Sequence, residues 1–171
     1  MDADKPQLKF WLIGLAMFGV LIAMSFIRGD ASQYTIIDHQ AAGTAAMVDT
    51  IQADWRANGL RPLAIISMFG DLIFIGVYGW GSYVAGRSFS RMGPGFLRIV
   101  GVVVAVAAVV FLITDYVETI LQVIQLLQER GVDWMAGTAA TMQPIKIAAW
   151  VVTFLGVIAG LLLSLLAKRT S

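Results

Sequence analysis

The chain has 171 residues, a formal net charge of +1 and a hydrophobic fraction of 58%, above the roughly 45–50% of a soluble domain. With a mean hydropathy of +0.79, it is predicted to form one compact integral membrane domain, residues 1–171, and the balanced charge argues against a nucleic-acid partner. The sequence has no Cys and His39 is its only His, which excludes disulfides, thiolate metal sites and a bis-His haem within one chain, so we expect no metal and no cofactor.

The first hydrophobic segment, residues 8–27, meets the length of roughly 20 residues that a membrane-spanning helix requires. A signal peptide is the alternative interpretation, but its apolar core of roughly 7–15 residues is shorter than this segment. We therefore predict a first transmembrane helix over residues 8–27.

The loop over residues 28–61 is too long for a simple connector. Within it, apolar residues recur at steps of three and four, as on one face of a helix. These residues are Ile37, Ala41, Ala45, Val48, Ile51 and Trp55. Gly43 and Thr44 are expected to break the pattern into two pieces, with Thr44 as an N-cap. We predict a short amphipathic helical cap over the outer end of the bundle; a helix resting on the lipid surface is the alternative.

The second hydrophobic segment, residues 62–85, is followed by a short connector over residues 86–96. The connector contains Arg87, Arg91 and the turn sequence Gly93-Pro94-Gly95, which is typical of a positively charged cytoplasmic loop. A site for an anionic lipid at this connector is one reading of these arginines.

The third segment, residues 96–128, would form a helix of about 50 Å, longer than the roughly 30 Å hydrocarbon core. Its far end should therefore protrude into water or line a wet cavity. The fourth segment covers residues 143–167, and Thr138 before it is predicted to cap a helix start, as Thr44 does. Gly156 and Gly160 form a GxxxG step, which packs helices either within the bundle or between copies of the chain.

The distribution of Lys and Arg predicts the orientation of the chain in the membrane. One side would carry Lys5, Lys9, Arg87, Arg91, Arg98, Lys168 and Arg169. The other side would carry Arg28, Arg56, Arg61, Arg130 and Lys146. The excess on the first side favours a topology with both termini in the cytoplasm.

Four ionisable residues interrupt the hydrophobic segments: Asp71 in the second, Asp115 and Glu118 in the third, and Lys146 in the fourth. Each such group costs roughly 2.5–3.5 kcal/mol to insert into hydrocarbon, so it normally faces the bundle interior and has a partner. Asp115 and Glu118 are three residues apart and therefore share a helix face. All four residues lie at a similar depth in the predicted topology. We predict that they meet in the outer half of the bundle.

Gln122, Tyr78 and Tyr116 also belong to the candidate site. Gln122 continues the face of Asp115 and Glu118, and Gln125 extends it by another step. Tyr78 and Tyr116 could offer aromatic faces to a quaternary amine, although core packing is the plainer interpretation of each.

Part of the chain, from about His39 to Trp150, resembles a family of small four-helix bacterial membrane proteins whose activity is not established. The matching positions are Ala42-Gly43-Thr44, Trp55, Asp71, Phe74, Tyr78, Asp115, Glu118 and Lys146. The family has Asp-x-x-Glu-Asn in its third helix and Lys-Trp at the start of its fourth, whereas this chain has Thr119 and Ile147 at the last position of each motif. The resemblance implies a four-helix protein of the bacterial inner membrane and supplies no reaction.

Several functions remain open at this stage. The acidic cluster either locks the helix bundle or binds a small cation, an amine or a lipid headgroup, since its acids outnumber its bases. A proton-coupled transporter or channel is the alternative, and it would require an oligomer because Val102 to Leu112 is wholly apolar. An intramembrane enzyme using Asp115 and Glu118 as acid and base is a second alternative. We expect a non-catalytic protein whose partners are membrane lipid and either further copies of itself or another membrane protein.

Overall fold

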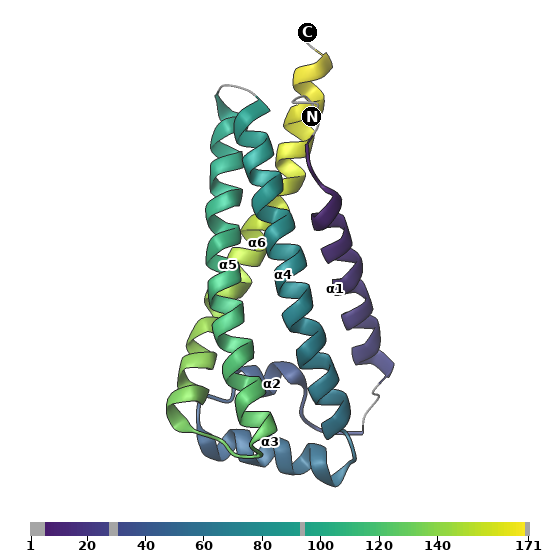
Figure 1. The fold of residues 1–171 in the computed structure, drawn as a ribbon, viewed down its shortest axis with the longest axis vertical. Coiled ribbons are helices and arrows are strands. Elements are labelled where there is room, and N and C mark those ends of the chain that lie inside the picture. The colour runs from purple at the N-terminus through teal and green to yellow at the C-terminus, as the bar shows by residue number, and fades with distance from the viewer. Residues whose placement is uncertain (1–5, 28–30, 93–94, 170–171) are drawn as a thin grey trace.

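The computed structural model describes residues 6–27, 31–92 and 95–169, and this part of the chain is all-α, as predicted. Its helices are α1 (Lys9–Ile27), α2 (Ile36–Gln40), α3 (Ala45–Ala57), α4 (Arg61–Met92), α5 (Phe96–Leu127) and α6 (Asp133–Arg169). The long helices α4, α5 and α6 pack side by side, and α1 packs against α4 (Figure 1). The short helices α2 and α3 lie across one end of this bundle, and the start of α1 and the end of α6 lie toward the other end.

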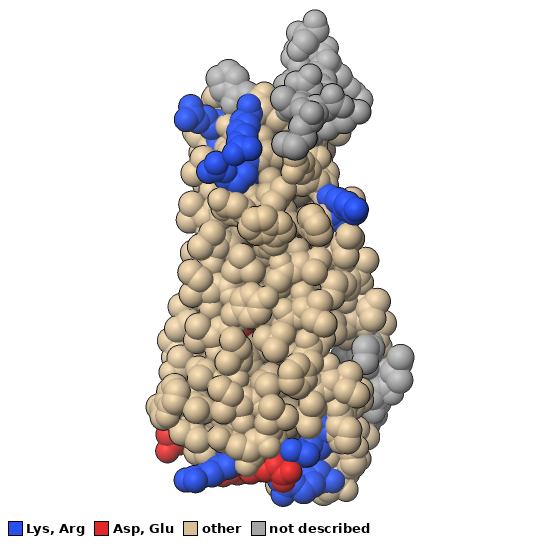
Figure 2. Space-filling view, viewed as in Figure 1, with Lys and Arg blue, Asp and Glu red and all other residues tan. Residues whose placement is uncertain are grey.

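Three helices of the described chain, α4, α5 and the part of α6 from Asp133 to Leu166, are long and apolar enough to cross a membrane. The first helix is apolar over a shorter described stretch, Lys9–Ala23. Charged side chains gather at the two ends of the molecule, and a broad uncharged band lies between them (Figure 2). These features identify the chain as an integral membrane protein.

Glycines allow the helices of the bundle to approach closely. A Cβ at Gly14 of α1 would lie only 2.7 Å from Cα of Tyr78 on α4, and one at Gly86 of α4 would lie 2.6 Å from the backbone nitrogen of Ala105 on α5. Both members of the GxxxG step face the interior, because Gly156 contacts Val104 and Gly160 contacts Phe89. The step therefore packs helices within the bundle, as small residues commonly do in membranes.

The predicted ends of two helices require correction. The second predicted helix continues past residue 85 to Met92, since no proline interrupts the sequence between these residues. The fourth begins at Asp133 rather than at residue 143, so Thr138 lies inside α6 and caps no helix start. Pro144 is also inside α6, although proline removes a backbone N–H and is usually confined to the first turn of a helix. The prediction for the third segment agrees with α5, Phe96–Leu127.

The cap forms as two helices, as the sequence indicates. Thr44 caps α3 by accepting a hydrogen bond from the backbone N–H of Met47, and Gly43 before it has φ of 70°. Thr35 and Asp38 form a capping box that starts α2. The apolar face of α3 is turned toward the bundle, where Ile51 and Trp55 are buried.

This packing decides where the far end of α5 lies. Ile51 and Trp55 belong to one apolar cluster with Val123 and Leu126 of α5 and with residues of α4. Gln122 and Gln125, in the last two turns of α5, are each only 1% exposed. One face of the end of α5 is therefore buried at the cap, because the apolar faces of α3 and α5 cover each other, whereas Ile124 and Leu127 on its other face are exposed.

Candidate functional site

Lys146 of α6 forms ion pairs with two carboxylates of α5. Its Nζ lies 2.9 Å from Oδ1 of Asp115 and 2.8 Å from Oε1 of Glu118. The two acids converge on one amine because residues three apart share a helix face. Glu118 is fully buried, and Asp115 and Lys146 are only 3% and 9% exposed. These three residues, named the buried triad below, join α5 to α6.

Asp71 of α4 joins the cluster through Thr119. The hydroxyl of Thr119 lies 3.3 Å from Oδ2 of Asp71 and 3.5 Å from Oδ1 of Asp115. A hydroxyl has a single hydrogen, so Thr119 donates to one of the two carboxylates at a time. Asp71 is half-buried and makes no ion pair in the described part of the chain, since the only amine of the cluster is bound to Asp115 and Glu118.

The two glutamines have different partners. Gln122 donates from Nε2 to Oε1 of Glu118 at 3.2 Å and so extends the buried triad toward the cap. Gln125 accepts a hydrogen bond at 3.0 Å from the backbone N–H of Val132 and thereby holds the turn between α5 and α6. Gln122 therefore belongs to the polar cluster, whereas Gln125 orders a loop.

A cavity of about 410 Å³ opens beside Asp71, between α1, the cap and the first turns of α4. Phe18 and Leu21 of α1, Tyr34 and Ile36 of the cap region, and Met68 of α4 contribute apolar surface. Polar groups come from Ser32, Thr35, Gln40 and Ser67, and Asp71 is the only charged side chain among the described residues of the lining. The cavity thus connects an unpaired carboxylate with a largely apolar chamber of the size typical for small-molecule sites.

Tyr78 and Tyr116 hydrogen-bond to groups other than the acids and the amine of the cluster. The hydroxyl of Tyr78 lies 3.0 Å from that of Thr153, and its ring packs between Phe74, Phe111 and Trp150. Tyr78 follows Asp71 by seven residues, which places it about 10 Å farther along α4. The hydroxyl of Tyr116 donates to the carbonyl of Leu72 at 3.2 Å, and its side chain points in a different direction from that of Asp115, because consecutive helical residues do not share a face.

The cap contains a buried ionisable group that the sequence did not single out. His39 is 2% exposed, its ring stacks on Trp55 with centroids 5.2 Å apart, and its Nε2 lies 3.3 Å from Nε2 of Gln52. Burial lowers the pKa of His39 from 6.5 to about 4, so the ring is neutral near pH 7. The available signal in the sequence was the position of His39 on a short helix, α2, that directly precedes the apolar face of α3.

Sequence reasoning also missed Thr119 as the link between Asp71 and Asp115. Its position four residues after Asp115 on the same face was the available signal. Among the described residues, no group of three His, Cys, Asp or Glu side chains is arranged to hold a metal ion.

No family model, curated protein or solved structure matches this chain. The resemblance built on Asp115, Glu118 and Lys146 is therefore an expectation, and the helical membrane architecture is the part of it that the structure supports. What the site does has to be inferred from its own geometry.

Proposed function

We propose that this protein is a non-catalytic membrane binding protein that receives a small organic cation at Asp71. The observation that carries the proposal is the contrast in pairing between the acids of one cluster. Asp115 and Glu118 share Lys146 at 2.8–2.9 Å, whereas Asp71 faces a cavity and has only the hydroxyl of Thr119 as a recorded partner.

The charges of the cluster favour a positively charged ligand. The cluster contains three carboxyl groups and one amine, so a bound cation would supply a positive charge that the described residues of the cluster lack. An unpaired charge is expensive within a membrane, and a ligand that supplies the missing partner is correspondingly stabilised.

The lining of the cavity favours a cation that carries apolar groups. Apolar side chains from α1, the cap and α4 form most of the wall, and none of the described residues that line it is basic. Phe18 and Tyr34 offer aromatic rings, which attract ammonium groups through their electron-rich faces. A substituted or quaternary amine fits this combination better than a hydrated metal ion or a phosphate.

The buried triad has a structural task in this proposal. It fixes α5 against α6, and Thr119 on the same face of α5 ties Asp71 of α4 to this cluster by a hydrogen bond. The lock and the binding site are thus two parts of one polar cluster.

The proposal is tested with benzyltrimethylammonium as the probe, added to the full chain in lipid nanodiscs and followed by calorimetry. We expect saturable binding of the probe and weaker binding of neopentylbenzene, its neutral counterpart of similar shape. Asp71→Asn should weaken binding of the cation at least tenfold, about 1.4 kcal/mol. The matched control is Asp49→Asn, which removes an exposed carboxylate at the same end but keeps an acceptor for the N–H of Gly131.

Equal affinity for the charged and neutral probes would contradict the proposal, as would full binding by Asp71→Asn.

The structure gives less support to the two alternative functions, a transporter and an enzyme. A transporter needs a polar route toward the termini, and Phe74, Phe89, Val104 and Phe111 are buried in that half of the bundle. An enzyme would need Asp115 and Glu118 to act as acid and base, but both carboxylates are paired with Lys146.

We further propose that α1 is a fourth span and that both termini face the cytoplasm, in a bacterial inner membrane. Lys9, Arg87, Arg91 and Arg98 lie toward the termini, whereas the described acidic residues outside the bundle lie at the cap end. Because the chain has no Cys, single substitutions can report each side. Thr50→Cys in α3 should react with a membrane-impermeant maleimide in intact spheroplasts, and Arg91→Cys only after permeabilisation; the reverse pattern would contradict this orientation.

A further inference from the structure

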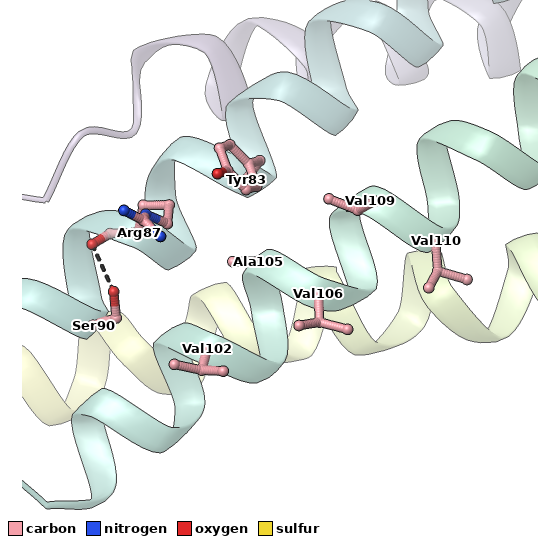
Figure 3. Close-up of a pocket in the computed structure, with 8 residues that line it drawn as sticks. All are labelled: Tyr83, Arg87, Ser90, Val102, Ala105, Val106, Val109 and Val110. Carbon is pink, nitrogen blue, oxygen red and sulfur yellow. Dashed lines mark hydrogen bonds between the residues drawn. The ribbon is translucent and has the colours of Figure 1, made fainter.

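A second cavity, of about 320 Å³, lies between α4 and α5 at the end of the bundle opposite the cap. On α4 it is lined by Tyr83, Arg87 and Ser90, and on α5 by a stripe of small aliphatic residues from Val102 to Val110 (Figure 3). The stripe extends over about 12 Å, which is most of the depth of one leaflet's hydrocarbon layer. The cavity is separate from Asp71 and its chamber, with which it shares no lining residue.

The two ends of this groove differ in polarity. Arg87 and Ser90 lie at the end of the groove near Val102, whereas Tyr83 and the other small aliphatic residues of α5 line the part toward the bundle centre (Figure 3). The hydroxyl of Ser90 donates to the backbone carbonyl of Arg87 at 2.9 Å, and the side chain of Arg87 is exposed. A groove with a polar end and a long aliphatic part is complementary to a lipid headgroup and its acyl chain.

The charge around the groove specifies the headgroup. Arg87, Arg91 and Arg98 are all exposed, and none forms an ion pair with an acid in the described part of the chain. Arg98 also precedes Val102 by four residues and so extends the same face of α5 toward the membrane surface. At the cap end, by contrast, Arg56 and Arg61 both pair with Glu129, at 2.8 and 3.0 Å.

We propose that this groove binds one anionic glycerophospholipid, with an acyl chain along Val102 to Val110 and its phosphodiester on Arg87. Arg91 and Arg98 add positive charge at the mouth, and the planar guanidinium of Arg87 can bind two phosphate oxygens at once. This inference is independent of the cation site, since it concerns other residues at the other end of the molecule. It agrees with a cytoplasmic location for this end, because anionic lipids are concentrated in that leaflet.

The experiment is native mass spectrometry of the full chain released from vesicles that contain equal amounts of phosphatidylglycerol and phosphatidylcholine with identical acyl chains. The wild-type chain should retain one phosphatidylglycerol at least fivefold more often than one phosphatidylcholine. Arg87→Gln should reduce this preference to near unity, and Arg87→Lys should retain most of it. The control Arg130→Gln removes the same charge at the cap end and should leave the preference unchanged.

A second pair of variants tests the acyl-chain track. Val106→Trp fills the groove and should reduce retention of both lipids, whereas Val103→Trp adds the same bulk to an exposed residue of α5 that does not line the groove. Soluble glycerol 3-phosphate should not displace the retained lipid. Equal retention of the two lipids by the wild type, an unchanged preference in Arg87→Gln, equal effects of the two tryptophans, or displacement by glycerol 3-phosphate would overturn the proposal.

Discussion

Asp115 and Asp71 both lie within reach of the hydroxyl of Thr119, but their surroundings differ in charge and access. Asp115 is buried, pairs with Lys146 at 2.9 Å and faces the interior between α5 and α6. Asp71 is half-buried, forms no recorded ion pair and faces a cavity of about 410 Å³. Inside a membrane, a carboxylate with its own amine can hold a fold together, whereas one without an amine is suited to meet a ligand.

The largest effect is expected when the amine of Lys146, which Asp115 and Glu118 share, is removed. Lys146→Met keeps the length of the side chain but leaves Asp115 and Glu118 buried without their cation. Breaking a buried ion pair by removing one partner typically costs about 3–5 kcal/mol, and we expect a loss of unfolding free energy in that range. Thermal unfolding in detergent micelles provides the measurement.

A compensated variant distinguishes lost charge balance from lost packing. Lys146→Met combined with Asp115→Asn and Glu118→Gln removes all three charges and should regain most of the stability that the single variant loses. Such non-additivity is expected for groups in direct contact. A triple variant no more stable than Lys146→Met would show that the ion pairs do not lock α5 to α6.

His39 extends the comparison to a buried group that has no opposite charge beside it. Its pKa is lowered by burial from 6.5 to about 4, so the cap is fully stable above pH 6.5 and loses stability as the pH falls toward 4. Between these values the unfolded cap binds more protons than the folded one, which costs roughly 3 kcal/mol in total. Hydrogen exchange of α2 and α3 should therefore accelerate across this pH range.

A control variant isolates the contribution of His39. His39→Phe preserves an aromatic ring against Trp55 and should make exchange in the cap independent of pH between 4 and 6.5. The pKa of Asp38 is lowered by its hydrogen bonds to Thr35, so its contribution is lost only below its ordinary value of 3.8 and falls in a separate window. Acceleration that persists in His39→Phe would assign the effect to another group.

A smaller effect separates the two aspartates directly. Asp115→Asn deprives Lys146 of one carboxylate in a buried site and should cost about 2 kcal/mol, because hydrogen bonds to charged groups contribute about 1.5–3 kcal/mol. Asp71→Asn loses only a long contact to Thr119 and should change stability by less than about 1 kcal/mol. Equal losses in thermal unfolding would mean that Asp71 is as much a structural residue as Asp115.

The sequence predicted those parts of the fold and site that depend on spacing along one helix. The bounds of α5, the N-cap at Thr44 and the convergence of Asp115, Glu118 and Lys146 follow from helix length, cap chemistry and the step of three residues. The start of α6 at Asp133 was not predicted from the sequence, because Pro144 suggested a helix start, whereas neighbouring helices allow a proline inside a helix.

Features built from distant segments were beyond the sequence. The cavity at Asp71 combines Phe18 of α1, Tyr34 before α2 and Met68 of α4, whose meeting depends on how the cap folds back on the bundle. The positions of Tyr78 and Tyr116 depend on how α4 and α5 are rotated about their axes. Both helices are apolar on most sides, so the sequence does not determine this rotation.

The smallest expected effect concerns the exposed ion pairs at the cap end, which contrast with the buried triad. Glu129 pairs with Arg56 and Arg61, but the three side chains are 43%, 53% and 29% exposed, so water and salt screen their attraction. Glu129→Gln should lower the free energy of unfolding by less than about 1 kcal/mol, and by less still in high salt. Thermal unfolding of Glu129→Gln and Lys146→Met at low and high ionic strength measures this difference. A loss in Glu129→Gln as large as that in Lys146→Met, or one insensitive to salt, would show that burial does not set the value of an ion pair in this protein.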